Sequence, residues 1–346
     1  MREMEKVNKG LRLFVALWVA VVMHSCVFAQ ETYRVAFWNV ENLFDVMDDS
    51  CRNDDAFTPK GENRWTPSRY KTKLHHLAQT IVAMGDDGGG LSAAPVVVGL
   101  AEVENDKVLR DLCNATLLRR LGYRFIHFDS PDRRGIDNAL LYRKDFFRPL
   151  YSVPLSVSDS AEDFYTRDIL LVAGTLPRGD TLFVLVNHFP SKRGGAAADV
   201  RRRRVAQTLR YVMDTVSAAH RCQAMAVMGD FNASPNEAEI RKIVVGAGDD
   251  REYVNLMASD TNGEGTYKFQ GQWDCLDQII VPQSMLGSDG CSGLKINGVH
   301  IFAPDFLLLD DDNKMGKKVN RTYLAMKYQG GYSDHLPVFV ELKIEN

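Results

Sequence analysis

The residues of this 346-residue chain with the most obvious chemical potential lie at the ends of apolar runs. They are carboxylates, amides and imidazoles, namely Asn39, Glu102, His188, Asp230, Asn232, Asp277, Asp334 and His335. Singly, each has an ordinary structural explanation, such as capping a turn or forming a surface ion pair. Together they indicate a site, because loops at strand ends commonly carry binding and catalytic groups.

The oxygen ligands in this set predict a hard divalent cation. Carboxylate and amide oxygens without cysteine suit Mg²⁺, with Mn²⁺ or Ca²⁺ as alternatives, better than Zn²⁺. The two histidines add groups that can transfer a proton or stabilise a developing anion. The sequence has neither a Gly-x-Ser-x-Gly elbow nor a Walker A phosphate loop. The pattern therefore predicts metal-assisted attack of water on a phosphate ester.

The elements that must position these side chains form a mixture of strands and helices. Apolar, β-branched runs typical of buried strands lie at 33–38, 95–100, 123–128, 139–142, 169–176, 181–186, 224–228, 276–281 and 336–342. Helical patterns lie between them, at about 107–121, at about 197–219, and after the capping pair Thr66-Pro67. The order predicts an α/β (α+β) protein with two sheets and outer helices.

The first 29 residues have the pattern of a secretory signal peptide. Basic residues precede the apolar run 11–23, and Val27-Phe28-Ala29 provides a small-residue cleavage site. The run is shorter than the ~20 residues that a membrane-spanning helix needs. We therefore expect cleavage after Ala29, a secreted or periplasmic protein and no stable membrane insertion. Lipidation of Cys26, as in a bacterial lipoprotein, is the weaker alternative.

The composition, 45% hydrophobic and 25% charged, is that of a globular protein and excludes a disordered or fibrous chain. The net charge is −3, and removal of 1–29, which carries four basic and two acidic residues, makes it −5. No general cationic surface therefore indicates a nucleic-acid partner, and phosphate would have to meet a local strip such as Lys192, Arg193 and Arg201. Five scattered cysteines remain, without zinc-site spacing; one disulfide is possible, but its pairing is open.

Six sequence blocks resemble those of the endonuclease/exonuclease/phosphatase superfamily, which has the fold of pancreatic deoxyribonuclease. In chain order they are VAFWNVENLF at 35–44, LAEVE at 100–104, VNHFPSK at 186–192, MGDFN at 228–232, LDQII at 276–280 and YSDHLP at 332–337. The resemblance implies one catalytic domain over 30–346. It also implies a four-layer α/β/β/α sandwich, in which two packed mixed β-sheets lie between outer helices.

The resemblance also implies roles for the site residues. Glu102 would be the principal metal ligand, with Asn39 beside it and Asp334 assisting. Asp230 would orient or deprotonate the attacking water, and Asn232 would hold that water or the phosphate. The catalytic residues would further include His335, Asp277 and His188. His335 would contact a phosphate oxygen, and Asp277 would fix the His335 ring. His188 would protonate or stabilise the leaving oxygen.

Three further residues are weaker candidates for contact with substrate phosphate. Asp137, in the segment RGIDN at 134–138, stands where the family often places a polar catalytic group. A solvated turn explains Asp137 equally well, and Asn138 is an alternative. Lys192 and Arg193 follow His188 in a glycine-containing turn from which they would reach a phosphate.

The function expected from these observations is a secreted or periplasmic, Mg²⁺-dependent phosphodiesterase, in particular a nuclease of low sequence specificity, acting as a monomer. One alternative is the same chemistry on another phosphoester, as in an inositol-phosphate phosphatase or a sphingomyelinase-like phospholipase. The other is a non-catalytic binding module that has kept the fold. This second alternative fits less well, since every catalytic position is filled by a competent residue type.

Overall fold

A computed structural model describes residues 32–85, 93–220, 224–246, 252–258, 265–287, 292–312, 314 and 316–344. The chain divides into two compact units, Met1–Thr32 and Tyr33–Asn346, and the sheets and helices described below belong to the second. The predicted signal peptide and Cys26 lie outside the described residues.

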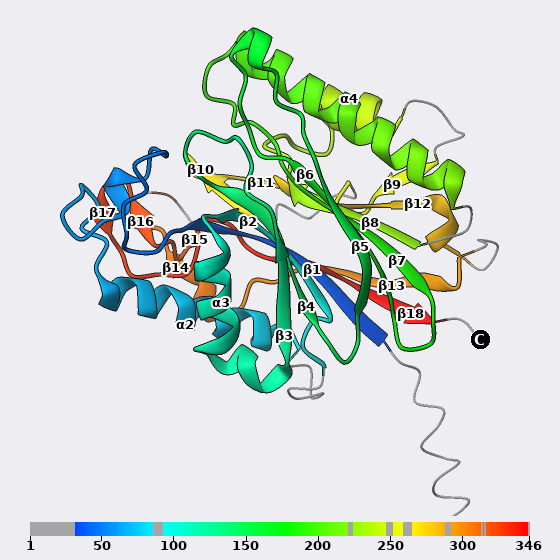
Figure 1. The fold of residues 1–346 in the computed structure, drawn as a ribbon, viewed down its shortest axis with the longest axis horizontal. Coiled ribbons are helices and arrows are strands. Elements are labelled where there is room, and N and C mark those ends of the chain that lie inside the picture. Colours follow the sequence, from blue (N-terminus) through cyan, green and yellow to red (C-terminus); the bar gives the residue numbers. More distant parts are fainter. Residues whose placement is uncertain are drawn as a thin grey trace, which may run out of the picture. The chain divides into compact units, whose positions relative to one another are not determined.

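Two six-stranded sheets form the centre of this unit (Figure 1). The first has the order β13 (Leu294–Ile301), β18 (Val338–Ile344), β1 (Thr32–Leu43), β2 (Val97–Val103), β4 (Asp137–Arg143) and β3 (Tyr123–His127). The second has the order β5 (Arg148–Leu155), β6 (Ile169–Thr175), β7 (Thr181–His188), β8 (Ala224–Asp230), β12 (Asp277–Pro282) and β9 (Tyr253–Asn255). In the first sheet β1 pairs with β2 in parallel, and in the second β7 pairs with β8 in parallel.

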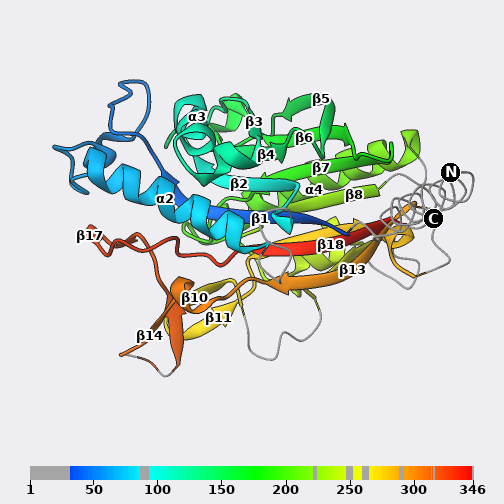
Figure 2. The ribbon, with the colours of Figure 1, turned by 90° about the horizontal axis from the view of Figure 1, so that it is seen from below.

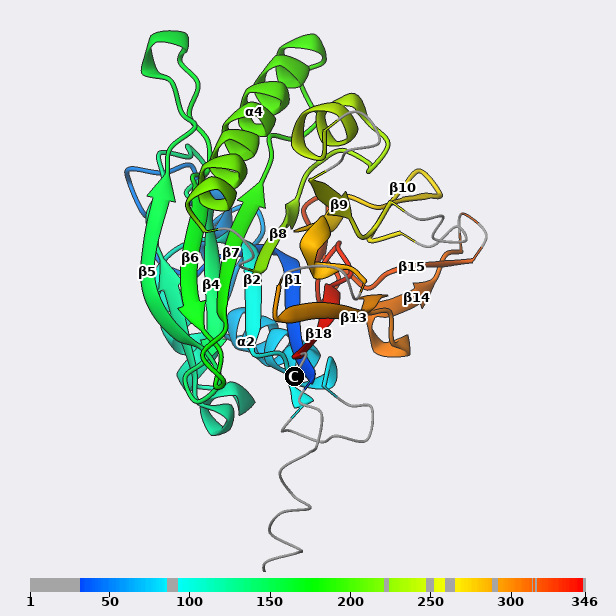
Figure 3. The same ribbon diagram turned by 90° about the vertical axis from the view of Figure 1, so that its right-hand side faces the viewer.

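Helices cover the outer face of each sheet. Figure 1 shows α2 (Pro67–Ala83) and α3 (Asp106–Asn114) on the side of the first sheet, and α4 (Ala196–Ala219) on the side of the second. Figure 3 shows α4 lying along β6, β7 and β8. One buried cluster joins α2 and α3 to the first sheet, a second fills the space between the sheets, and a third joins α4 to the second sheet. This arrangement confirms the four-layer α/β/β/α sandwich.

Strand periodicity explains how β1 serves two of these clusters. Ala36 and Trp38 pack in the helix-side cluster, whereas Val35 and Phe37 pack between the sheets. Successive side chains of a strand point to opposite faces, so a strand buried on both faces is apolar throughout. The sheets approach closely at Gly99, where an added Cβ would stand 2.7 Å from the Met228 sulfur.

The helix starts follow local capping chemistry. Thr66 accepts a hydrogen bond from the Arg69 N–H at 3.4 Å, and Pro67 occupies the first helical position. The predicted helix at 107–121 is instead two elements, α3 and the 3₁₀ helix η4 (Leu117–Leu121). The reason is local: the Thr116 side chain accepts from the Leu118 N–H and so starts a new turn. The sequence patterns also missed β5, β9 and β13.

Shorter elements complete the unit. Three hairpins, labelled in part at one end of the sheets in Figure 2, are β10 (Tyr267–Phe269) with β11 (Gln272–Asp274), β14 (Leu308–Asp310) with β15 (Lys317–Val319), and β16 (Tyr323–Leu324) with β17 (Lys327–Tyr328). The remaining helical turns are η2 (Asp55–Phe57), η5 (Ser160–Glu162), η7 (Gln283–Met285), η8 (Asp305–Leu307) and the π-helical η6 (Glu239–Val244).

Cys51, Cys113 and Cys275 are free thiols, while Cys222 and Cys291 lie outside the described residues. Within the part of the chain that the structure describes, no helix has the length and apolar character needed to cross a membrane.

Candidate active site

The sheet registers bring several predicted site residues to neighbouring strand ends. In the second sheet His188, at the end of β7, is paired with Asp230, at the end of the parallel strand β8. Asp230 is also paired with Asp277, the first residue of β12. Paired residues of adjacent strands carry their side chains on the same face, so these three groups are neighbours.

In the first sheet, irregular pairing between β1 and β2 positions Asn39 and Glu102. Asn39 is paired with Ala101, and the register shifts directly after both residues. Glu102 lies in the shifted part with φ of 65°, in the left-handed region that non-glycine residues seldom occupy. Its Oε2 accepts a hydrogen bond from the Asn42 N–H at 2.9 Å. A bulge of this kind redirects a side chain, and backbone strain of this kind is concentrated at functional sites.

Asp230 lies at the centre of the assembled group. Its Oδ2 accepts a hydrogen bond from the Asn39 side-chain amide at 3.0 Å, and its Oδ1 accepts one from the Asn232 N–H at 2.9 Å. The same Oδ2 lies 3.6 Å from His188 Nε2 and 3.8 Å from His335 Nε2. One buried carboxylate therefore faces two imidazoles, one from the end of β7 and one from the segment before β18.

His335 is fixed on several sides. Its Nδ1 lies 2.7 Å from Asp277 Oδ2, which is fully buried. Its backbone carbonyl accepts a hydrogen bond from the Trp38 indole at 2.9 Å, and the Tyr267 ring lies 4.8 Å from its ring, centre to centre. The carboxylate at Nδ1 favours the ring with a proton on that atom and leaves Nε2 directed toward Asp230.

Burial and neighbouring charges give these groups different protonation preferences. Burial, reinforced by the charge of Asp277, raises the pKa of Asp230 to about 7. Burial opposes a charge on His335, but the carboxylates of Asp277 and Asp230 outweigh it and raise the pKa of His335 well above its usual value. For His188, burial and the nearby Arg167 hold the pKa well below its usual value. The site therefore combines a neutral and a cationic imidazole around one carboxylate.

Glu102 and Asp334 lie at the margin of this group, and each is near an arginine. Glu102 Oε1 is 4.0 Å from His188 Nε2, and Arg134 lies 3.8 Å from Glu102 Oε2. Asp334 Oδ1 is 4.0 Å from His335 Nε2, and its Oδ2 accepts a hydrogen bond from Arg321 at 2.7 Å. The carboxylates of Glu102 and Asp334 thus flank the imidazole–carboxylate group, and carboxylate oxygens fit a hard divalent cation. Asn39 turns its amide N–H toward Asp230, while its Oδ1 accepts the Glu41 N–H at 3.0 Å.

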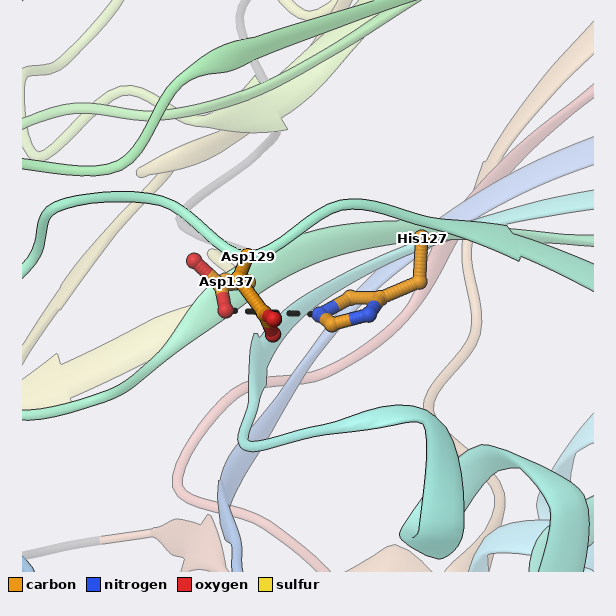
Figure 4. Close-up of side chains that lie close together, drawn as sticks. All are labelled: His127, Asp129 and Asp137. Carbon is orange, nitrogen blue, oxygen red and sulfur yellow. Dashed lines mark hydrogen bonds and ion pairs between the residues drawn. The ribbon is translucent and has the colours of Figure 1, made fainter.

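The three weaker candidates for phosphate contact, Lys192, Arg193 and Asp137, have neighbours other than the group around Asp230. Lys192 forms an ion pair with Glu237 at 2.7 Å, and Arg193 is exposed. Asp137 accepts hydrogen bonds from the N–H and hydroxyl of Ser130 and lies 3.3 Å from His127 Nε2. Figure 4 shows that contact, which is not with Asp230 or His335.

Sequence reasoning missed two buried charged residues, Glu41 and Lys73, that hold the segment leading to Asp334. Glu41, with φ of 52°, accepts hydrogen bonds from the backbone N–H groups of Thr322 at 2.6 Å and Tyr323 at 3.0 Å. Lys73 of α2 donates to the Thr322 hydroxyl at 2.6 Å and to the Tyr332 carbonyl at 2.5 Å. Burial raises the pKa of Glu41 to about 7 and lowers that of Lys73 to about 8.

These two residues secure the loop that leads to Asp334. Glu41 lies inside the block 35–44, where its strand position could have drawn attention. Lys73 offered no signal, because a lysine in a helical pattern usually indicates a solvated face. Arg134 was passed over in favour of Asp137 in the same segment.

Comparisons with known proteins agree with this architecture. The model of the endonuclease/exonuclease/phosphatase family matches residues 34–344. No curated protein sequence matches the chain significantly.

Among solved structures, an endonuclease/exonuclease/phosphatase family protein from Bacteroides thetaiotaomicron has 15% identity and a TM-score of 0.56, covering 92% of this chain and 100% of that one. A mannosyl-6-phosphatase from Bacteroides thetaiotaomicron has 17% identity and a TM-score of 0.55, covering 90% and 99%. TDP2 of D. rerio, complexed with a single-strand DNA product, has 15% identity and a TM-score of 0.54, covering 90% and 99%. At these identities the likeness shows the fold alone. The family match, which spans both sheets and all the residues gathered around Asp230, shows that the chain belongs to the endonuclease/exonuclease/phosphatase family.

Proposed function

We propose that this protein is a divalent-metal-dependent phosphodiesterase that cleaves nucleic acid by attack of water on phosphorus. Membership of the family indicates a phosphoester hydrolase. The observation that carries the proposal is the placing of His188 and His335 within 4 Å of the same oxygen of buried Asp230. Hydrolysis of a phosphodiester needs a group that takes a proton from water and a group that stabilises the leaving oxygen.

In this proposal each side chain has one task. Asp230, whose pKa is raised to about 7, takes a proton from the attacking water at its Oδ2. Cationic His335, held by Asp277, donates a hydrogen bond from Nε2 to a non-bridging phosphate oxygen. His188 protonates or stabilises the leaving oxygen, and Asn232 holds the water or the phosphate.

The donor atoms present fit a divalent cation. Glu102 and Asp334 would hold it, since they offer two carboxylates beside the catalytic group. Asn39 would join them through its Oδ1, which here accepts the Glu41 N–H. When bound, Mg²⁺ there would act as a Lewis acid that neutralises charge on the phosphate oxygens. Mn²⁺ and Ca²⁺ are the alternatives for this position.

Hydrolysis assays on a panel of phosphate esters distinguish the candidate substrate classes. With Mg²⁺, we expect the purified protein to cleave plasmid DNA or RNA, and Asp230→Asn to abolish that cleavage. EDTA should stop the reaction, and added Mg²⁺ should restore it. Turnover that survives EDTA would exclude the metal mechanism. Turnover of inositol phosphates, sugar phosphates or sphingomyelin without nucleic-acid cleavage would refute the nuclease assignment.

A phosphomonoester is the second candidate, for one specific reason. A pocket of about 250 Å³ that includes Glu104, Asp45 and Asp137 in its lining lies close to the end of β2 that carries Glu102. Carboxylates there would repel an extended polyanion more than a small sugar phosphate. One structural neighbour is described as a mannosyl-6-phosphatase. The same panel of esters separates this candidate from the nuclease.

We also propose that the protein is exported, with residues 1–29 removed, and acts as a monomer. The support for export is the charged, apolar and small-residue pattern of the N-terminus. Mass spectrometry of the protein recovered from the medium or periplasm, and its mass in solution, would test both points. A cytoplasmic protein that still begins at Met1 would contradict export.

A further inference from the structure

The acidic pocket beside the candidate active site supplies none of the catalytic groups described above. It has a volume of about 250 Å³. Carboxylates from three separate segments contribute to its lining, namely Asp45, Asp48, Asp49 and Asp54 after β1, Glu104 after β2, and Asp129 and Asp137 in the stretch from the end of β3 to the start of β4. Three segments that are distant in sequence thus present like charges to one space.

Basic side chains do little to neutralise this charge. Arg52 is the one arginine or lysine among the described residues that line the pocket, and its guanidinium donates to the backbone carbonyls of Asp132 at 2.7 Å and Ser130 at 3.0 Å. Lys107 lies 3.8 Å from Asp45 Oδ2 but pairs more closely with Asp111, at 2.9 Å. Like charges gathered in a partly enclosed space repel one another unless a cation joins them.

A separate observation points to a missing ligand. Asp54 lines the pocket and is only 2% exposed. Its Oδ2 accepts the Asp49 N–H at 3.0 Å, whereas its Oδ1 is buried without any hydrogen-bond partner in the described part of the chain. A buried carboxylate oxygen left unpaired is costly, and bound cations commonly satisfy such atoms.

A second group of donor atoms adjoins the same space. Ligand atoms of His127, Asp129 and Asp137 all lie within 4.8 Å of one another. Figure 4 shows the three side chains directed toward one another, and Asp129 and Asp137 also line the pocket. Because Asp137 is already held by Ser130 and His127, Asp129 is the member with the greater freedom to bind an ion.

We propose that this pocket binds Ca²⁺, separately from the catalytic cation, and joins the loop after β1 to the ends of β2 and of the β3–β4 connection. Ca²⁺ takes six to eight oxygen ligands in flexible geometry, which suits carboxylates supplied by loops; Mg²⁺ requires a near-ideal octahedron. The inference does not depend on the proposed substrate or on catalysis.

The test compares Asp54→Asn with Asp55→Asn, which makes the same charge change at an exposed neighbour that does not line the pocket. Both are made in a Glu102→Gln background, and Ca²⁺ binding is measured by calorimetry. We expect Asp54→Asn to weaken Ca²⁺ binding at least about tenfold, because affinity depends on the number of charged ligands. Asp55→Asn should bind as the background protein does.

Thermal unfolding provides a second readout that does not involve activity. With Ca²⁺ at a hundred times its Kd, Tm should rise by roughly 5 °C in the background protein and by much less in Asp54→Asn. In EDTA, Asp54→Asn should be at least as stable as the background, because the substitution relieves repulsion.

A second variant guards against a folding defect. Asp129 is exposed, so Asp129→Asn should fold normally and still weaken Ca²⁺ binding. Unchanged Ca²⁺ affinity in both Asp54→Asn and Asp129→Asn would overturn the proposal. So would binding of Mg²⁺ with equal affinity, or the absence of any Ca²⁺-dependent rise in Tm.

Discussion

Replacing Asp277 by Asn tests the proposed division of labour around His335. Asp277 is fully buried, and its Oδ2 lies 2.7 Å from His335 Nδ1. With charge centres about 4 Å apart and an effective dielectric constant near 20, the attraction is worth about 4 kcal/mol. Asn keeps the volume and an acceptor oxygen, but it removes the charge that favours the imidazolium.

We expect kcat/KM at neutral pH to fall by about 10²- to 10³-fold, because each ~1.4 kcal/mol of lost transition-state stabilisation costs a factor of ten and the retained acceptor offsets part of the loss. The pH dependence should also move. Asp277 raises the pKa of His335, so its loss should shift the alkaline limb, where His335 loses its proton, to lower pH. Asp277 also raises the pKa of Asp230, so the acid limb should move in the same direction.

The assay is a pH profile of kcat/KM for Asp277→Asn, with an NMR titration of the His335 ring and circular dichroism to verify folding. Asp145→Asn, in an exposed turn after β4, is the matched control and should behave as the wild type does. If both limbs stayed in place in a folded Asp277→Asn protein with near-normal turnover, the roles given to Asp277 and His335 would be wrong.

Three further predictions concern the catalytic residues, the buried Lys73 and the cap of α2. Asp230→Asn and His335→Ala should each reduce turnover by several orders of magnitude without altering the far-ultraviolet circular dichroism, and near-normal rates in either would show that their roles are misassigned. Lys73→Met should lower the free energy of unfolding by about 3 kcal/mol, because the Thr322 hydroxyl and the Tyr332 carbonyl would lose a buried, charged donor. Chemical denaturation should show this, whereas Lys71→Met, exposed on the same helix, should have little effect. Thr66→Ala should cost about 0.5–1 kcal/mol through the lost α2 cap, and an unchanged unfolding midpoint would contradict that.

The elements of the fold were largely predictable because their signals are local. Continuous apolar runs indicated strands buried on both faces, and Thr66-Pro67 indicated the start of α2, as the structure has it. The division of α3 from η4 depends on the Thr116 side chain bonding to its own backbone, which hydrophobic periodicity does not register. Strand β5 was missed because its side chains are mostly exposed, so it carries no continuous apolar pattern.

The residue types of the candidate site could be read from the sequence alone, and hard oxygen donors with two histidines at strand ends predict metal-assisted phosphoester chemistry. How they meet required the tertiary structure. Asp277 and His335 are 58 positions apart, and Lys73 and Thr322 are 249 apart. The directions in which the pKa values move depend on burial and on those long-range neighbours, and the acidic pocket exists only where three loops converge. Residue order determines which groups are available, but distance and desolvation, which decide what the groups do, arise only when the sheets pack.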